Sequence, residues 1–219
     1  MNPLTPCLLL AFALFFSSCA APQAETSGAP PSPDQALARL KEGNKRAVEG
    51  HLQGPKTSSG LRVELAKGQQ PFAVVLGCAD SRVGPEIIFD QPLGNLFVCR
   101  VAGNVSDPEV AGSIEYAVEH LHSPLIAVIG HSECGAVKAA LSGGAVEGNL
   151  GVLLRRVHTG SGLPKNEPEK LDAAIRNNVA QQCQTLVQNS PVIRKAVKEG
   201  KVRIVGGVYS LHTGEVTWQ

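Results

Sequence analysis

Two short motifs combine residue types that can bind a metal ion or take part in a reaction. In "GCADSR" a thiol, a carboxylate and a guanidinium group alternate as Cys78, Asp80 and Arg82, directly after the apolar run "FAVVL". In "GHSEC" the imidazole of His131 and the thiol of Cys134 stand three residues apart, after the apolar run "PLIAVI". Two thiolates and one imidazole form a ligand set typical of zinc, and three protein ligands leave a fourth coordination position open.

The same residues allow other interpretations. Asp80 and Arg82 at alternate positions of an extended turn lie on one side, which favours a carboxylate–guanidinium pair. Asp80 could instead complete the coordination of a purely structural zinc. A cysteine alone can be a small core residue, His131 can bond to the backbone, and a cysteine–histidine pair can be a nucleophile with its base. Because both motifs follow predicted strands, we favour the zinc site.

The rest of the chain predicts a scaffold that brings the two motifs together. Short apolar runs predict strands over 71–77, 95–103, 123–131, 201–210 and 215–219. Helical periodicity predicts helices over 32–50, 61–71, 106–122, 134–144 and 168–189, and Pro191 begins another. This alternation predicts an α/β fold: a mostly parallel sheet flanked by helices, with an antiparallel C-terminal hairpin at its edge. Ligands of such sheets bind beyond the carboxyl ends of the strands, where both motifs lie.

Composition excludes one class of partner. The formal net charge is +1 and aromatic residues make up 4% of the 219 residues. A nucleic-acid interface needs a basic surface or a set of stacking rings, so no nucleic acid is expected as a partner. The length suits one domain with a sizeable core.

The N-terminus reads as a targeting segment. The apolar run "LLLAFALFF" is of signal-peptide length and too short to span a bilayer, and "SSCAAP" follows it. We predict a lipoprotein-type signal peptide over 1–18, with a lipid on Cys19; the alternative is an ordinary export signal cut after Ala20. Residues 19–33 are rich in Ala, Pro and Ser and predict a flexible tether, which leaves 34–219 as the folded catalytic domain. The expected location is the periplasm, with the lipid as the anchor to a bacterial membrane.

The six cysteines fall into three groups, the first of which is Cys78 and Cys134 in the two motifs. Cys7 and Cys19 belong to the signal region. Cys99 within a strand and Cys183 on a helix are predicted to be small core residues rather than ligands, although an exported chain can also pair cysteines as disulfides.

Taken together, the motifs resemble those of the β-class carbonic anhydrases. "CADSR" and "GHSECGAVKAAL" carry the resemblance, which continues through "DQPLGNLFVCRVAGN", "AGSIEYAVEHL" and "GGVYSLHTGEV". It implies Zn²⁺ on Cys78, His131 and Cys134, and an Asp80–Arg82 dyad. It also implies reversible hydration of carbon dioxide to bicarbonate and a proton.

The resemblance further implies an oligomer. The carbon dioxide pocket of the family lies at a dimer interface, so we expect a homodimer or tetramer in which the N-terminal helices pack on the partner. By position, Gln69, Phe97, Ala102, Tyr116 and Gly135 match this pocket. The family usually has valine where Ala102 stands, which predicts a slightly roomier pocket.

Some bacterial members hold an inhibitory bicarbonate with a Trp–Arg–Tyr trio. Arg100 and Tyr209 match two of these residues, but Val75 stands at the tryptophan position. The chain therefore matches two residues of this trio and lacks the third.

The expected mechanism uses a zinc-bound hydroxide, because zinc lowers the pKa of its bound water to roughly 7. Asp80 paired with Arg82 would orient that hydroxide, and Gln69 would donate a hydrogen bond to the substrate. Asp80 released from Arg82 would become a fourth ligand in a closed state, which high pH should disfavour. The candidate proton carriers are His51, His120, His122, His158 and His212.

Three alternatives remain open from the sequence. Carbon disulfide or carbonyl sulfide could be hydrolysed on the same site. The chain could be a non-catalytic zinc-binding protein, or a thiol hydrolase that uses a cysteine and a histidine.

Overall fold

The computed structural model describes residues 30–53 and 57–219. Cys19, the predicted signal peptide and most of the predicted tether lie outside these residues, so these predictions stay as they were made. Within the described part of the chain, no helix is both long and apolar enough to cross a membrane.

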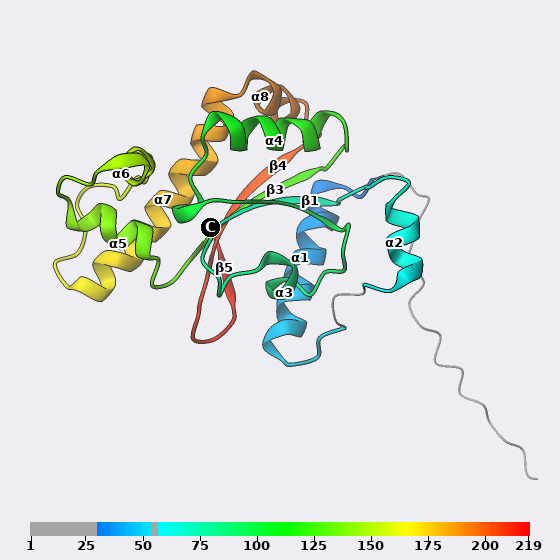
Figure 1. Ribbon diagram of the computed structural model, residues 1–219, viewed down its shortest axis with the longest axis horizontal. Coiled ribbons are helices and arrows are strands. Elements are labelled where there is room, and N and C mark those ends of the chain that lie inside the picture. The colour runs from blue at the N-terminus through cyan, green and yellow to red at the C-terminus, as the bar shows by residue number, and fades with distance from the viewer. Residues whose placement is uncertain (1–29, 54–56) are drawn as a thin grey trace, which may run out of the picture.

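The centre of the fold is a five-stranded sheet with the order β2-β1-β3-β4-β5 (Figure 1). The first four strands in this order are parallel, and β5 pairs antiparallel with β4. This confirms the predicted mixed sheet with its C-terminal hairpin. The strands are β1 (Ala73–Gly77), β2 (Leu96–Arg100), β3 (Leu125–His131), β4 (Arg203–Tyr209) and β5 (Val216–Trp218).

Helices connect the strands, and several begin where the sequence predicts a start. Asp107 accepts a hydrogen bond from the Val110 N–H and Pro108 opens the helix that follows. The longer helices are α1 (Pro33–Val48), α4 (Pro108–Glu119), α5 (Gly135–Ser142), α7 (Glu167–Asn189) and α8 (Pro191–Lys198). The shorter ones are α2 (Ser59–Leu65), α3 (Pro85–Ile88), α6 (Gly148–Leu154) and the 3-10 turn η1 (Ala102–Asn104). Of these shorter elements, periodicity predicted α2 alone, because three or four residues carry no period and α6 lies in a glycine-rich stretch.

The sheet separates two apolar cores. Alternate residues of β1 face opposite sides, so Ala73 and Val75 join one core while Val74 and Leu76 join the other. Helices α1 and α3 cover the first face, and α4 and α8 cover the second (Figure 1). A parallel sheet buried on both faces explains why its strands read as continuous apolar runs.

The two N-terminal helices pack differently. Ala36, Leu37 and Leu40 of α1 are buried in the chain's own core, so this face of α1 is already covered. In contrast, α2 has no buried residue and its Val63 is 61% exposed. The expected packing on a partner therefore remains a prediction that concerns α2 and the outer surface of α1.

Candidate active site

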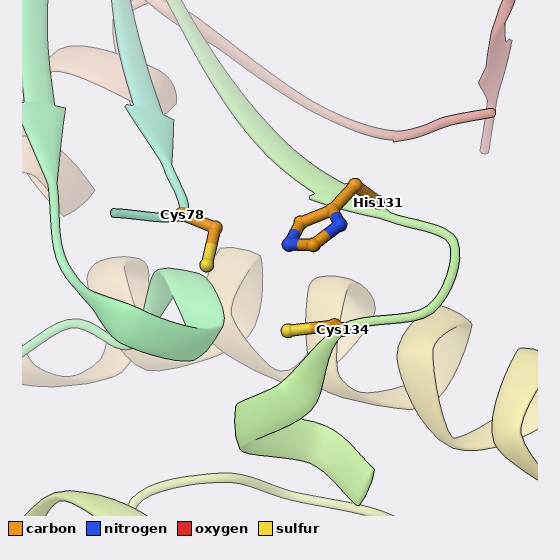
Figure 2. Close-up of side chains that lie close together, drawn as sticks. All are labelled: Cys78, His131 and Cys134. Carbon is orange, nitrogen blue, oxygen red and sulfur yellow. The ribbon is translucent and has the colours of Figure 1, made fainter. Parts of the chain in front are cut away.

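The two motifs meet at the carboxyl-end edge of the sheet. Cys78 directly follows β1, His131 is the last residue of β3, and Cys134 caps α5. Because β1 and β3 are parallel neighbours, with Gly77 opposite Ile129, their ends lie side by side. The ligand atoms of these three buried residues lie within 4.8 Å of one another. Figure 2 shows the two sulfur atoms and the imidazole ring pointing toward a common space.

The position of this cluster in the sheet follows a general rule. From β1 the chain first adds β2 on one side and then β3 on the other, so the strand order reverses beside β1. Such a reversal opens a crevice at the carboxyl ends of the two central strands, where α/β proteins bind ligands. Cys78 and His131 occupy the two sides of this crevice.

The imidazole of His131 is oriented to act as a ligand. Its Nδ1 lies 2.9 Å from the backbone oxygen of Ser132, a group that can only accept. The proton is therefore on Nδ1, and the Nε2 lone pair faces the cluster. This Nε2 is buried and has no hydrogen-bond partner among the described residues. A buried polar atom without a partner is costly, and a metal ion would satisfy it.

The two sulfur atoms also suit a cation. A hydrogen bond from the Cys134 thiol lowers the pKa of Cys78, and the same contact, together with burial, raises the pKa of Cys134. Two adjacent thiols without a cation therefore favour one thiolate and one thiol. A dication between them would neutralise two thiolates, so the Cys–His–Cys donor set fits a soft metal such as zinc.

Asp80 and Arg82 form the expected ion pair. Arg82 Nε donates to Asp80 Oδ1 at 2.9 Å and Nη2 donates to Oδ2 at 2.7 Å, so the pair is bidentate. These hydrogen bonds hold the pKa of Asp80 well below its usual range. Asp80 Oδ2 lies 3.9 Å from His131 Nε2, which places the ionised carboxylate beside the cluster.

Arg100 has a contact that sequence reasoning did not anticipate. Its Nε donates to the backbone oxygen of Cys78 at 2.9 Å, and its Nη2 donates to that of Asp80. Arg100 thus fixes the loop that carries both residues. Tyr209, its suggested partner in a bicarbonate site, ends β4, three strands away from β2, and Val75 is buried in the core. At about 4.8 Å per strand, the two backbones are about 14 Å apart.

A buried amide network lies behind the cluster. The Gly103 N–H donates to Cys78 Sγ at 3.3 Å, and the Gly103 oxygen accepts from Asn178 Nδ2 at 2.8 Å. Asn178 Oδ1 in turn accepts from Gln182 Nε2 at 3.2 Å. Sequence reasoning missed this network. The sequence did contain a sign of it, because two amide side chains at helical spacing fall on the apolar face of α7.

The predicted pocket residues divide into two groups. Ala102 opens η1 two residues after the end of β2, and Gly135 follows Cys134 at the start of α5, so both lie at the carboxyl-end edge. Phe97 belongs to the core on the α4 side of the sheet, whereas Cys78 and Cys134 belong to the other core. Tyr116 of α4 lies next to Phe97, with ring centroids 6.4 Å apart.

Gln69 lies at the opposite end of β1 from the cluster. It precedes β1, whereas Cys78 follows it, and the five residues of β1 span about 16 Å. Gln69 and Tyr116 are both exposed. Within one chain, therefore, Gln69, Phe97 and Tyr116 do not line the space between the three ligand candidates.

The histidines proposed as proton carriers all lie at the surface. His51, His120, His122, His158 and His212 are exposed. His212 lines a cavity of about 390 Å³ together with Ser132 and Glu133, which connect the two ligand candidates of the second motif. The structure does not bring any of the five into hydrogen-bond contact with Asp80.

The remaining cysteines lie apart from the cluster. Cys78, Cys99, Cys134 and Cys183 are all free, so the described residues contain no disulfide. Burial raises the pKa of Cys99 to about 11 and that of Cys183 to about 12. Both are therefore protonated and behave as small apolar groups, and Cys183 lines a groove between α7, α8 and β4.

Fold and site together define an α/β protein with a Cys–His–Cys group that could hold a soft metal ion at the point where the strand order reverses. The model of the family described as carbonic anhydrase matches residues 73–216. The chain belongs to this family, and its fold and relatives place it in the β class, so it is a carbonic anhydrase.

Individual relatives cover most of the chain. Carbonic anhydrase 2 of Mycobacterium tuberculosis is 44% identical over 188 residues, which span 84% of this chain and 91% of the relative. The β-carbonic anhydrase of Coccomyxa, solved in complex with acetazolamide, is similar with a TM-score of 0.68 and 29% identity, over 83% of this chain and 85% of that one. A structure of two tetrameric β-carbonic anhydrases from Sordaria macrospora gives a TM-score of 0.66 and 27% identity, over 84% and 96%.

Proposed function

We propose that this carbonic anhydrase hydrates carbon dioxide reversibly at a zinc ion held by Cys78, His131 and Cys134. The observation that carries the proposal is the convergence of three buried ligand atoms within 4.8 Å, one of which, His131 Nε2, has no other partner among the described residues. When bound, zinc would supply a Lewis acid that brings the pKa of a coordinated water to near 7.

The Asp80 carboxylate orients the attacking water. Arg82 keeps Asp80 ionised, and an ionised carboxylate can only accept hydrogen bonds. Oδ2 would therefore accept a hydrogen bond from the water, which directs a lone pair of the water oxygen toward the carbon of the substrate. Arg100 supports this by holding the Cys78–Asp80 loop in place.

Arg82 controls whether Asp80 can reach the cluster. While the bidentate pair is intact, Arg82 engages both carboxylate oxygens, and these hydrogen bonds compete with coordination of a metal by Asp80. Loss of the pair frees a carboxylate that already lies 3.9 Å from His131 Nε2. The freed Asp80 would occupy the fourth position and displace the water.

A second copy of the chain completes the substrate pocket. Ala102 and Gly135 border the crevice, but Gln69, Phe97 and Tyr116 lie elsewhere in their own chain. Tyr116 is 49% exposed, and α2 has no buried residue, so this surface is available to a partner. The tetrameric relatives from Sordaria macrospora support such an assembly. Apolar rings from the partner would exclude water around carbon dioxide, and Gln69 would donate to its oxygen.

Zinc content and carbon dioxide hydration, measured on one purified sample, test the function. We expect about one zinc per chain and a hydration rate that disappears when a chelator removes the metal. Full activity in a zinc-free sample would contradict the metal-dependent mechanism and favour the thiol hydrolase alternative.

We further propose that the enzyme acts outside the cytoplasm on a lipid anchor. The support is the sequence alone, an apolar run followed by small residues around Cys19. Mass spectrometry of the native N-terminus should find an acylated Cys19. A free N-terminus at Ala21 would mean simple secretion.

A further inference from the structure

We infer that Asn178 of α7 is a positioning residue for the metal site, acting through the Gly103 peptide on the Cys78 sulfur. The inference rests on the proposed role of Cys78 as a metal ligand. Asn178 touches neither substrate nor metal. Its effect would be to hold one backbone N–H against one ligand atom.

The contacts form an unbroken path from α7 to the sulfur. Asn178 Nδ2 donates to the Gly103 oxygen at 2.8 Å, and the N–H of Gly103 donates to Cys78 Sγ at 3.3 Å. The carbonyl and the N–H of Gly103 belong to the two peptide groups that flank its Cα, so anchoring the carbonyl limits rotation of the N–H. Asn178 is completely buried, and water cannot replace its hydrogen bond.

The Gly103 backbone needs this anchor. Its φ of +70° lies in the left-handed region, and a Cβ there would come within 3.2 Å of Val157 Cγ2 and 3.3 Å of Ala136 Cβ. Glycine fits this close space because it has no Cβ, but for the same reason its backbone is the least restricted of all residues. A hydrogen bond from a rigid helix supplies the missing restriction.

Asn178 is itself held on its other side. Its Oδ1 accepts from the His158 N–H at 3.0 Å and from Gln182 Nε2 at 3.2 Å. Gln182 Oε1 accepts from both the N–H and the hydroxyl of Ser106, at 2.8 and 2.9 Å. Acceptors and donors alternate through the network, which assigns the Asn178 amide nitrogen to the Gly103 side. The network joins α7 to Gly103 in the middle of η1 and to Ser106 just after η1.

The chemical effect follows from the hydrogen bond to sulfur. An N–H directed at a thiolate withdraws charge from it, so the sulfur gives less electron density to a metal and the metal remains a stronger Lewis acid. Loss of the hydrogen bond should therefore alter the metal's electronic environment even when the ligand set is unchanged. A second effect is positional, because Cys78 is held less firmly without this contact, and loss of an outer-shell partner typically costs about 10- to 100-fold in metal affinity or activity.

Asn177 supplies a matched control. It is the same residue type on the same helix, and its Nδ2 also donates to a backbone oxygen, that of Thr159, at 3.0 Å. Unlike Asn178 it is exposed and its partner has no contact with the cluster. Asn178→Ala and Asn177→Ala therefore remove the same amide group, but only Asn178 has a hydrogen-bonded path to Cys78.

The experiment uses the full chain loaded with Co²⁺ or ¹¹³Cd²⁺. In the wild-type protein and Asn177→Ala, we expect a thiolate-to-Co²⁺ charge-transfer band at the same wavelength and a ¹¹³Cd coupling to the Gly103 amide proton across the hydrogen bond. In Asn178→Ala the band should move to longer wavelength, the coupling should vanish, and Zn²⁺ affinity in chelator competition should fall about tenfold. Thermal unfolding of each variant reports its folding separately.

The possible results separate the two proposals. A wild-type protein without a thiolate-to-Co²⁺ band would overturn the proposed metal site itself. A normal band in the wild type with an unchanged band, coupling and affinity in Asn178→Ala would overturn the role of Asn178. If Asn178→Ala does not fold, Asn178→Leu fills the same space without the donor, and the wild-type ¹¹³Cd coupling to Gly103 needs no variant at all. Absence of that coupling in a metal-loaded wild type would also overturn the inference.

Discussion

The carboxyl-end edge of the sheet and the surface around Tyr116 differ in how complete they are within one chain. At the edge, Cys78, His131 and Cys134 are buried, and the side chains of Asp80 and Arg82 already have their partners. Around Tyr116, a ring that is 49% exposed packs on Phe97, which belongs to the core on the other face of the sheet from Cys78 and Cys134. One chain thus assembles the Cys–His–Cys cluster and its Asp80–Arg82 pair by its own folding, whereas the substrate wall is proposed to need a second copy. Variants at the two regions should therefore behave differently.

The largest effect is expected from removing a ligand at the complete region. Cys134→Ser should bind zinc more than about 100-fold more weakly, because loss of a direct ligand exceeds the 10- to 100-fold cost of losing an outer-shell group. Carbon dioxide hydration should fall to background in the same preparation. Metal analysis after dialysis, together with stopped-flow hydration rates, checks both. Retained zinc and activity in this variant would show that Cys134 is not a ligand.

Arg82→Ala tests the control of Asp80, with zinc retained and activity lowered. Without Arg82 the pKa of Asp80 rises toward its usual value, so the carboxylate is still ionised at neutral pH and is free to bind the metal. We expect about a 100-fold lower rate near pH 7. The loss should shrink as pH rises, because hydroxide then competes better with the carboxylate. Rates and zinc content across pH measure this, and a wild-type rate at pH 7 would mean that Arg82 has no such role.

Asp80→Asn separates orientation from blocking. The neutral amide is a poor metal ligand, so zinc should stay bound and the closed state should not form. The rate should still be low at every pH, because an amide can present a donor where the water needs an acceptor. A rate that recovers at high pH, as expected for Arg82→Ala, would argue against orientation by Asp80.

Hybrid oligomers test whether the second region acts across subunits. One chain carries Cys134→Ser, and the other carries Gln69→Ala together with Tyr116→Ala. In a homodimer of the second chain, the hydration rate should fall about tenfold. In the purified hybrid, the intact metal site of one chain would meet the intact wall of the other. About half of the wild-type activity per dimer is then expected, because in an isologous interface each chain supplies the wall of the other chain's site and only one of the two sites is intact. If the wall acts within its own chain, the hybrid should be no more active than its parents.

The smallest effect is expected at a cysteine outside both regions. Cys183→Ala should leave zinc content unchanged, and hydration should stay within about twofold of wild type, because the protonated thiol of Cys183 on α7 only lines the groove toward α8 and β4. Metal loss from this variant would revise the ligand set. Its unaffected activity would also serve as the reference for Cys134→Ser.

The sequence by itself determined much of the scaffold and of the reactive cluster. Continuous apolar runs indicated buried parallel strands, and parallel strands place their carboxyl ends at one edge whatever the details of packing. Cys78 and His131, 53 positions apart in the chain, could therefore be placed together from the sequence alone. Their residue types, with Cys134, then predicted a soft metal such as zinc, because ligand preference is a property of the side chains themselves. The Asp80–Arg82 pair followed in the same way from local spacing.

Tertiary structure alone decided the features that depend on non-local geometry. The contact of Arg100 with the Cys78–Asp80 loop and the reach of Asn178 to Gly103 join segments 20 or more positions apart, and no periodicity encodes such pairings. The short elements α3 and η1 were likewise missed, because a few residues carry no repeating pattern. The separation of Gln69 and Tyr116 from the cluster also needed the fold. The resemblance in sequence identified these residues as pocket residues. Only the fold showed that Gln69 lies at the other end of β1 and Tyr116 on the other face of the sheet, so neither reaches the crevice of its own chain.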